Sequence, residues 1–449
     1  MSTTASDATL HFSGKAVTAW GGLALMQRML SAIGFRDAAA LWSLPQPGSN
    51  RGFDPVVLVE QFLVSLWCGA NRFSQMEINR HDRALARLFG WTKSAGHRAV
   101  VRLFQRFDLA TSSRVQHQMY GWFFSRLGLK RITLDVDSSV ITRWGKTQEG
   151  ARVGYNPRHH GRASHHPLIA FVADCRMIAN FWLRPGDCAS ATNMLSFLES
   201  TKQNLGETSI GLLRADSGFF ADEILTAFER DGIDYVVAAK LTAPLQAQLM
   251  SVKCRWWALE PGLELCEFDY QASSWAHPRR MVAVRQSPKL RASAPGKTLS
   301  LFKDDPAMRQ WRYGVVCTSL KLAAVEVWRS YRGRADCENR IKELKADFGL
   351  ESFNLRDFWA TEAALTATML AYNLMSLFRQ SAMRGAVQST MATLRHQVFA
   401  APAWRGAPSD RHANAYTLAI PRQRRAWFAG LWSDALDPPR LPAAMLNSS

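Results

Sequence analysis

Two short apolar segments that carry aspartates constrain this fold most. Residues 131–139 read Arg-Ile-Thr-Leu-Asp-Val-Asp-Ser-Ser and predict a buried strand, on which Asp135 and Asp137 share one face. Residues 210–220 form a second apolar run that ends in Asp216 and a Ser-Gly turn. A carboxylate in a strand core is costly unless it is paired or binds a metal. A lone aspartate at a strand end would indicate turn chemistry, but two such strands predict a shared divalent cation.

A third carboxylate is predicted on a helix between residues 331 and 345. Four side chains at spacings of three, four and seven fall within roughly a 60° arc of an α-helix. They are Tyr331, Arg334, Glu338 and Lys345. A carboxylate that binds a metal, beside cations that bind phosphate, suits phosphodiester chemistry. For this segment alone, a solvated helix with salt bridges is the alternative interpretation.

These segments resemble motifs of the DDE-type transposases of bacterial insertion sequences. Residues 331–345 match the Y-(2)-R-(3)-E-(6)-K signature of one group without departure. Residues 134–139 resemble the first-strand motif of the RNase H-like fold, and residues 214–219 look like the second-Asp motif of the family. Three further segments are similar to parts of one subgroup, namely 154–157, 161–168 and 183–186. The resemblance covers roughly residues 60 to 380.

The resemblance implies an α/β fold, with an RNase H-like mixed sheet flanked by helices. It implies that Asp137, Asp216 and Glu338 are the catalytic and metal-binding residues, and that Asp135 is an auxiliary or structural acid. The implied cofactor is Mg²⁺ or Mn²⁺, with two ions in each active site. The residues implied to bind DNA or phosphate from the signature are Tyr331, Arg334 and Lys345.

The activity implied is cleavage at the ends of an insertion sequence and joining of those ends to target DNA by two-metal-ion phosphoryl transfer. The implied partners are the terminal inverted repeats, the target DNA and a second copy of the chain in a synaptic homodimer, with no membrane. The expected location is the bacterial cytoplasm, at the nucleoid. A metal-dependent DNA nuclease is one alternative, and a non-catalytic DNA-binding derivative is another. The presence of all three acids counts against the second.

The spacing of the acids predicts the domain organisation. Asp137 and Asp216 are 79 residues apart (216 − 137), whereas Asp216 and Glu338 are 122 apart (338 − 216), too far for the simplest RNase H core. Short alternating runs between the last two predict a mainly β insertion. The expected parts are an α-helical N-terminal DNA-binding region at 1–125, a catalytic core at 126–240 and 324–380, the insertion at 241–323 and a basic C-terminal region at 381–449.

The composition is typical of a protein that binds a polyanion. The formal net charge is +18 and the sequence pI is about 10.0, which favours DNA but does not identify it. The seven cysteines form no C-x-x-C pair, so we expect buried or free thiols in a reducing compartment. The N-terminus resembles no signal peptide. The apolar run 360–378 is interrupted by Glu362 and Asn373, which predicts a helix buried against the catalytic sheet and not a membrane span.

Four helices are expected near the N-terminus, over residues 17–33, 54–67, 74–88 and 94–107. The second begins with an Asp cap followed by proline. The fourth predicts either a DNA-recognition helix or a basic solvated helix, because one flank carries His97, Arg98, Arg102 and Arg106.

A histidine cluster and several tryptophans complete the candidates. Arg158 and Arg162 are expected to contact phosphate or DNA backbone near the active site, since they stand among His159, His160, His165 and His166. Zinc is disfavoured because no cysteine spacing accompanies the histidines. The insertion tryptophans are expected mostly in the core, with one a candidate for stacking on a flipped base; they are Trp256, Trp257, Trp275 and Trp311.

Overall fold

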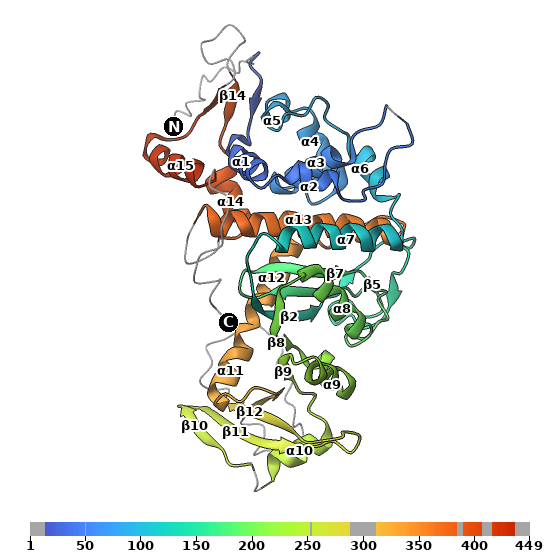
Figure 1. Cartoon of the computed structure of the whole chain (residues 1–449), viewed down its shortest axis with the longest axis vertical. Coiled ribbons are helices and arrows are strands. Elements are labelled where there is room, and N and C mark those ends of the chain that lie inside the picture. The colour runs from blue at the N-terminus through green and yellow to red at the C-terminus, as the bar shows by residue number, and fades with distance from the viewer. Residues whose placement is uncertain are drawn as a thin grey trace, which may run out of the picture.

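The computed structural model describes residues 14–49, 51–251, 254–287, 311–383, 389–405 and 415–435. Figure 1 shows an elongated molecule in which N-terminal helices lie at one end and the strands of the expected insertion at the other. A layer of two long helices and the central strands of a large sheet lie between them. The expected mixed α/β architecture, a sheet flanked by helices, is confirmed.

The described residues form a nine-stranded mixed sheet in the order β10-β11-β12-β13-β9-β8-β2-β6-β7. At its centre, β2 (Arg131–Ser138) pairs in parallel with β8 (Ser209–Ala215) and antiparallel with β6 (Leu168–Val172). Next to these, β7 (Met177–Trp182) runs antiparallel to β6, and β9 (Asp234–Ala238) runs parallel to β8. The strands β2, β6 and β7 are thus antiparallel to one another in sequence order, and β8 and β9 run parallel to β2. This is the RNase H-like arrangement expected from the sequence.

The pairing of β2 with β8 sets the position of the acids. Val136 lies opposite Ala215 in the parallel register, so the chain reaches Asp137 and Asp216 at the same level of two neighbouring strands. Leu134 and Leu213 are fully buried in the same two strands. Because side chains alternate between the faces of a strand, the burial of these apolar residues fixes which face the aspartates take.

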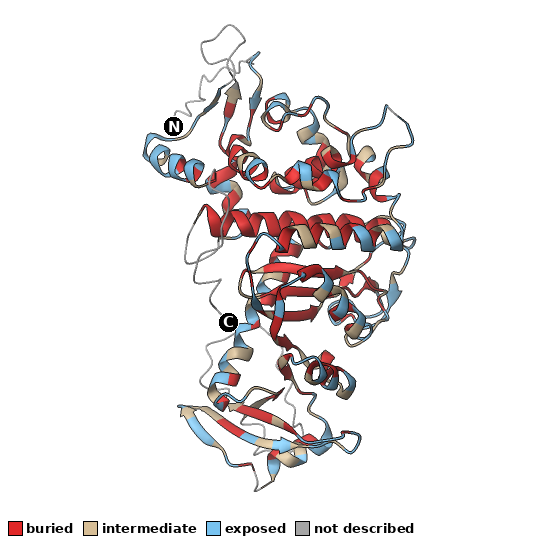
Figure 2. Ribbon diagram, viewed as in Figure 1, coloured by how far each residue is buried: buried red, intermediate tan, exposed pale blue. Residues whose placement is uncertain are grey.

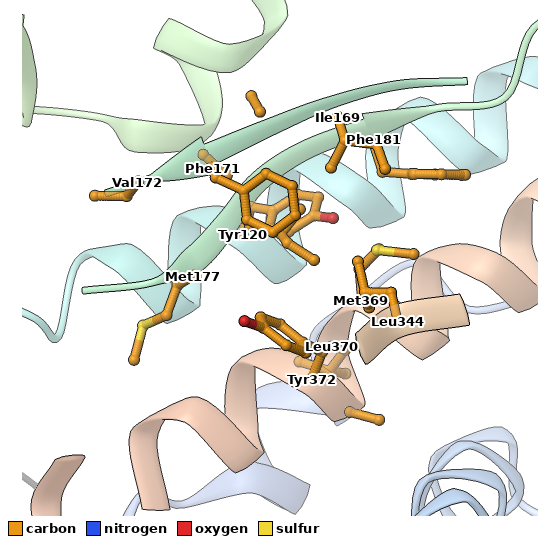
Figure 3. Packing of buried hydrophobic residues seen from close by; sticks show 14 of the residues in the cluster. Tyr120, Ile169, Phe171, Val172, Met177, Phe181, Leu344, Met369, Leu370 and Tyr372 are labelled. Carbon is orange, nitrogen blue, oxygen red and sulfur yellow. The ribbon is translucent and has the colours of Figure 1, made fainter. Parts of the chain in front are cut away.

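The long helix α13 (Phe358–Ser381) is buried from Ala360 to its end, as Figure 2 shows by its red colour. It packs on β7 on one side and on the helix α3 (Pro55–Trp67) on the other, and α7 (Leu109–Phe124) lies alongside it and also contacts β7. In Figure 3, Tyr372 of α13 lies among the apolar side chains that fill the space between this helix and the strands β6 and β7. The predicted buried helix is confirmed, and no helix in the described part of the chain is both long and apolar enough for a membrane span.

The two polar residues that interrupt this apolar run dock α13 onto the sheet. The amide of Asn373 accepts from Ile178 N at 2.7 Å and donates to Ile178 O at 2.8 Å. Glu362 Oε1 accepts from Leu183 N at 3.1 Å. Burial raises the pKa of Glu362 to about 8, against the opposing effect of this hydrogen bond. Both side chains therefore satisfy backbone groups at the edge of the sheet that would otherwise be buried without partners.

The N-terminal helices are shorter than predicted. The expected cap of α3 is confirmed, since the Asp54 carboxylate accepts from Val56 N at 2.8 Å. The expected helix over 17–33 is wrong at its start, where Val17–Thr18 forms β1 and pairs with β14 (Ala403–Arg405). Gly22 lies against the carbonyl of Val398, where a Cβ atom would clash, so the chain adopts a close backbone contact there. The other elements of this region are η1 (Gly21–Leu23), α1 (Ala24–Ala32), α2 (Phe35–Ala40), η2 (Phe73–Gln75), α4 (Met76–Arg80), α5 (Arg83–Leu88) and α6 (His97–Phe104).

The segment expected as a mainly β insertion extends the central sheet. The strand β13 pairs antiparallel with β9, and β12, β11 and β10 follow outward. Residues 288–310 of this segment, and 252–253, lie outside the described residues. The described elements are α10 (Ala243–Met250), β10 (Trp257–Glu260), β11 (Leu263–Tyr270), β12 (Arg279–Gln286) and β13 (Arg312–Thr318). The domain boundaries themselves stay a prediction.

The expectation of free thiols is wrong for one pair of cysteines. Cys254 and Cys266 form a disulfide, with Cα atoms 6.1 Å apart. The sequence does not show this pairing because the residues lie on a loop and on β11, which only the folded chain brings together. The other five described cysteines are free thiols.

Several remaining elements complete the catalytic region and the C-terminal region. A small sheet of β3 (Ile141–Thr142), β5 (Ala163–His165) and β4 (Arg152–Val153) lies beside the main sheet. The C-terminal residues 406–414 and 436–449 lie outside the described residues, as do 384–388. The other elements are α8 (Met194–Leu205), η3 (Ser217–Phe219), α9 (Asp222–Arg230), α11 (Ala324–Gly333), α12 (Ala335–Asp347), α14 (Met391–Leu394), a π-helical turn (Arg395–Phe399), β15 (Tyr416–Leu418) and α15 (Arg422–Asp434).

Candidate active site

The three expected acids come from two adjacent strands and one helix. Asp137 lies near the end of β2 and is 7% exposed. Asp216 follows β8 and caps η3, where its carboxylate accepts from Gly218 N at 2.8 Å. Glu338 lies in the first turn of α12 and is exposed. The structure thus offers one buried, one half-buried and one exposed carboxylate from three separate elements.

Arg334 joins two of these acids. Its Nη2 atom lies 3.0 Å from Asp137 Oδ1, and its Nη1 atom lies 3.3 Å from Glu338 Oε1. Burial raises the pKa of Asp137 to about 7, although Arg334 lowers it, and the nearby carboxylate of Asp216 raises it further. The ionised form of such an acid is stabilised strongly by a cation beside it, since a buried charge without a partner is costly.

The four signature residues do not lie on one uninterrupted helix, and that expectation is corrected. Tyr331 belongs to α11, Arg334 lies at the junction, and Glu338 and Lys345 belong to α12. The amide of Arg334 donates to Tyr331 O, three residues back. The carbonyl of Ser330, four residues back, accepts instead from Arg214 Nη1 at 2.7 Å. A side chain from the neighbouring strand therefore takes the acceptor that would bind the Arg334 amide in a regular α-helix.

Asp135 serves a different purpose from Asp137. Its two carboxylate oxygens accept from Arg214 Nε at 2.6 Å and Nη2 at 2.8 Å. Burial raises the pKa of Asp135, and this bidentate pair with Arg214 opposes the rise. Since Arg214 also binds Ser330 O, the pair ties β2 and β8 to the end of α11. This geometry supports a structural role for Asp135 and leaves Asp137 as the ligand candidate.

The remaining signature residues contact the protein as well. Lys345 Nζ donates to Val140 O at 2.8 Å and lies 2.8 Å from Glu351 Oε1. Tyr331 stacks on Trp328 with ring centroids 6.1 Å apart, and burial raises the pKa of its phenol. Lys345 therefore secures the segment after β2, and Tyr331 belongs mainly to the packing under α11.

A loop from the 183–186 motif connects the two strand ends. Arg184 donates to the carbonyls of Ala189, Ser190 and Thr192, which orders that loop. Ser190 Oγ lies 2.8 Å from Ser138 Oγ, beside Asp137. On the other side, a Cβ atom at Gly218 would lie 2.6 Å from Ser190 Cβ, so only glycine fits this close approach two residues after Asp216.

The four histidines do not converge on a metal site. His165 is buried between Arg143 Nε, which donates to its Nδ1 at 2.9 Å, and Glu149 O. Burial lowers its pKa to about 4. His166 Nδ1 lies 2.7 Å from Cys188 O, and burial lowers its pKa despite the opposing charge of Asp216. His159 and His160 are exposed. Within the described ranges, no group of three His, Cys, Asp or Glu residues is arranged to hold a metal.

The other predicted contact residues are placed as follows. Arg158 and Arg162 are exposed, and the Arg162 guanidinium lies 5.0 Å from the ring centroid of Trp144. On α6, Arg98 and Arg102 are exposed, whereas His97 Nδ1 lies 2.6 Å from Glu77 Oε1. Arg106 lies beyond the end of α6, and its Nη1 donates to Gln46 O.

The insertion tryptophans mostly have partners inside the protein. Arg285 lies 4.6 Å from the Trp256 ring centroid and 4.7 Å from that of Trp311. Trp275 is buried against Phe220. Of these four tryptophans, only Trp257 is exposed. The prediction that most of them would lie in the core fits Trp275 best.

The sequence reasoning missed Trp144 and Arg214. Trp144 is 65% exposed although it follows a buried strand residue closely, and this unusual placement becomes visible only in the fold. The signal for Arg214 was its position two residues before Asp216, on the same strand face, opposite Asp135.

The chemistry of the three acids suits divalent ions of the Mg²⁺ type, although in the described residues the acids are not gathered into a ready-made metal group. Asp137, Asp216 and Glu338 supply only carboxylate oxygens, the ligands that hard cations prefer. The guanidinium of Arg334 already bridges two of these acids, and its Nε is buried without a hydrogen-bond partner. The acids therefore carry negative charge that a cation can neutralise, and the Nε of Arg334 can donate to a further acceptor.

An RNase H-like sheet with an Asp, Asp and Glu set at these positions defines the class of DDE phosphoryltransferases. The sequence matches the family Transposase DDE domain group 1 over residues 2–410, so the chain belongs to that family and is a DDE transposase. No curated protein matches the sequence significantly.

Among solved structures, the chain is similar to the piggyBac transposase in a cryo-EM structure of its synaptic complex with hairpin DNA. The TM-score is 0.45 at 9% sequence identity, and the alignment covers 96% of this chain and 86% of that chain. At this level the likeness carries no argument about the residues of this site.

Proposed function

We propose that Asp137, Asp216 and Glu338 hold two Mg²⁺ or Mn²⁺ ions and catalyse cleavage at the ends of an insertion sequence, followed by joining of those ends to target DNA. The observation that supports this most is the parallel register of β2 and β8, which brings Asp137 and Asp216 to the same level while α12 presents Glu338. When bound, the ions supply Lewis-acid activation of the attacking oxygen and stabilisation of the leaving oxygen.

The residues around the acids then act on the DNA strand. Arg334 is held by Asp137 and Glu338 without metal, and its buried, unpartnered Nε is suited to donate to a phosphate oxygen. Lys345 keeps the segment after Asp137 in place through Val140 O. Arg158 and Arg162 are exposed and supply charge for the DNA backbone. Tyr331 supports Arg334 from α11 through its carbonyl, which accepts from the Arg334 amide.

The partners follow from this activity. The terminal inverted repeats and target DNA are the substrates, and a synaptic homodimer would hold two ends at once. The net charge of +18 suits this long polyanionic surface. Action on a bacterial insertion sequence would place the protein at the nucleoid in the cytoplasm. A nuclease without strand transfer and a non-catalytic DNA-binding protein are the alternatives.

The test compares the wild type with Glu338→Gln on DNA that carries the flanking repeats of the element, with and without Mg²⁺. Cleavage and joining by the wild type alone, with DNA binding intact in the variant, would establish the proposed function. Cleavage without joining would favour the nuclease. Inactivity of both proteins with tight DNA binding would favour the non-catalytic alternative.

A further inference from the structure

A large hollow lies beside the end of β2, next to the residues that follow Asp137. Its volume is about 710 Å³, within the range of about 300 to 1,000 Å³ that is typical of ligand pockets. Ser138 at the end of β2 and Ser139 just after it line the hollow, and Lys345 lines it from α12. The hollow therefore begins one residue from the first acid.

Two exposed aromatic side chains line this hollow. Trp144 is 65% exposed and Tyr155 is 69% exposed, although aromatic rings usually bury most of their surface. His159 packs its ring edge-on to Trp144, with centroids 5.2 Å apart, and Arg162 lies near the same ring. These contacts hold the indole in position while it remains open to solvent.

The backbone under Tyr155 is held by a glycine contact. A Cβ atom at Gly154 would clash with the carbonyl of Gly186, so the chain before Tyr155 lies directly on the 183–186 segment. The ring of Tyr155 lies 6.5 Å from that of His166, a buried residue just before β6.

The charge of the hollow suits a phosphodiester strand. Arg72, Arg158 and Lys345 line it together with one acid, Glu351, which gives a net charge of +2 (3 − 1) with histidine neutral. Glu351 pairs with Lys345, so Arg72 and Arg158, both exposed, carry the charge that faces solvent. Cations beside exposed aromatic rings are the combination that binds single-stranded nucleic acid.

We propose that this hollow binds an unpaired nucleotide of the DNA strand that passes the acids, with its base against Trp144 and Tyr155 and its phosphate near Arg158. The inference rests on the proposed function, because it names the form of DNA that the same site takes. An aromatic ring can stack only on a base that has left the duplex, where neighbouring bases cover both faces. The sequence favoured the insertion for such stacking, whereas the exposed rings beside the acids lie on the segment between β3 and β5.

The test measures binding without metal, so that it does not depend on cleavage. Fluorescence anisotropy would compare a blunt DNA duplex with the same duplex carrying a single-stranded thymidine overhang, in chelator. The proteins are the wild type, Trp144→Ala, Trp144→Phe and Tyr155→Ala. Trp257→Ala is the matched control, because Trp257 is another exposed tryptophan and lies on β10. Circular dichroism would check that each variant is folded.

We expect the wild type to prefer the overhang, and Trp144→Ala to lose about tenfold in affinity for the overhang with little change for the blunt duplex. Trp144→Phe should restore most of the preference. The proposal would be overturned if the wild type, Trp144→Ala and Tyr155→Ala all preferred the overhang to the same extent. It would also be overturned if only Trp257→Ala lost affinity for the overhang. If Glu338→Gln cleaved and joined DNA as well as the wild type while the overhang preference behaved as expected, the proposed function would fail and the nucleotide site would stand.

Discussion

The guanidinium of Arg334 lies 3.0 Å from Asp137 and 3.3 Å from Glu338, and so a protein cation occupies the place between two acids expected to bind metal. This arrangement explains how a carboxylate as buried as Asp137 is tolerated without metal. It also implies that metal and Arg334 compete for the same charges, after which the guanidinium is available for phosphate.

The competition can be measured with Arg334→Gln. Without metal, this variant should be less stable than the wild type. The loss should be smaller than the value of about 3 to 5 kcal/mol that is typical of a broken buried ion pair, because Asp137 can take up a proton. Added Mg²⁺ should raise its melting temperature more than that of the wild type, since binding to the folded state stabilises it. Arg332→Gln, an exposed neighbour, is the control. The same Mg²⁺ effect in all three proteins would contradict the competition.

Asp135 and Asp137 should respond oppositely to substitution. Arg214→Met should destabilise the fold by about 3 to 5 kcal/mol, because it leaves the Asp135 carboxylate buried without its partner. Asp137→Asn should abolish cleavage with a small effect on unfolding, whereas Asp135→Asn should reduce stability while the folded fraction still cleaves. Chemical denaturation and a cleavage assay on each variant check this. Loss of cleavage in a fully stable Asp135→Asn would assign the ligand role to Asp135.

Glu362 should make the stability depend on pH. Its pKa in the folded chain is raised from 4.5 to about 8, so its contribution is fully present below about pH 4.5 and is lost as the pH rises toward 8. Glu362→Gln keeps an acceptor for Leu183 N and removes the ionisation. At pH 8 we expect this variant to melt at a higher temperature than the wild type, with a free energy of unfolding larger by at least about 1 kcal/mol. At pH 4.5 we expect little difference between the two proteins.

The control for that experiment is Glu223→Gln on α9, since Glu223 is exposed. Thermal unfolding of all three proteins between pH 4.5 and 9 gives the readout. A wild-type curve parallel to that of Glu362→Gln across this range would show that the buried carboxyl does not titrate as expected.

The exposed flank of α6 provides a prediction about DNA. If Arg98 and Arg102 contact phosphates, the double change to Gln should weaken duplex binding for every sequence and should lower the slope of log affinity against log salt by about 2. Arg230→Gln on α9 is the control. Salt titrations by anisotropy check this, and an unchanged slope would identify α6 as a basic solvated helix.

The elements that carry the three acids could be predicted because the strand and helix signals around them are local. The apolar run that ends at Asp216 and the cap of α3 depend on neighbouring residues alone, and both appear in the structure. The break at Arg334 could not be predicted in this way. It depends on Arg214, which is 120 residues away (334 − 214) and takes the carbonyl of Ser330.

The sequence by itself determined the type of chain: the buried strands, the acids, the long apolar helix and the basic charge are all properties of composition and short-range pattern. Only the tertiary structure decided which aspartate is tied to Arg214, that β1 pairs with the C-terminal strand β14, and that Trp144 and Tyr155 stand open beside the acids. The physical reason is that partners, pairing and exposure depend on residues far apart in the chain, whose positions are set by burial of the whole core.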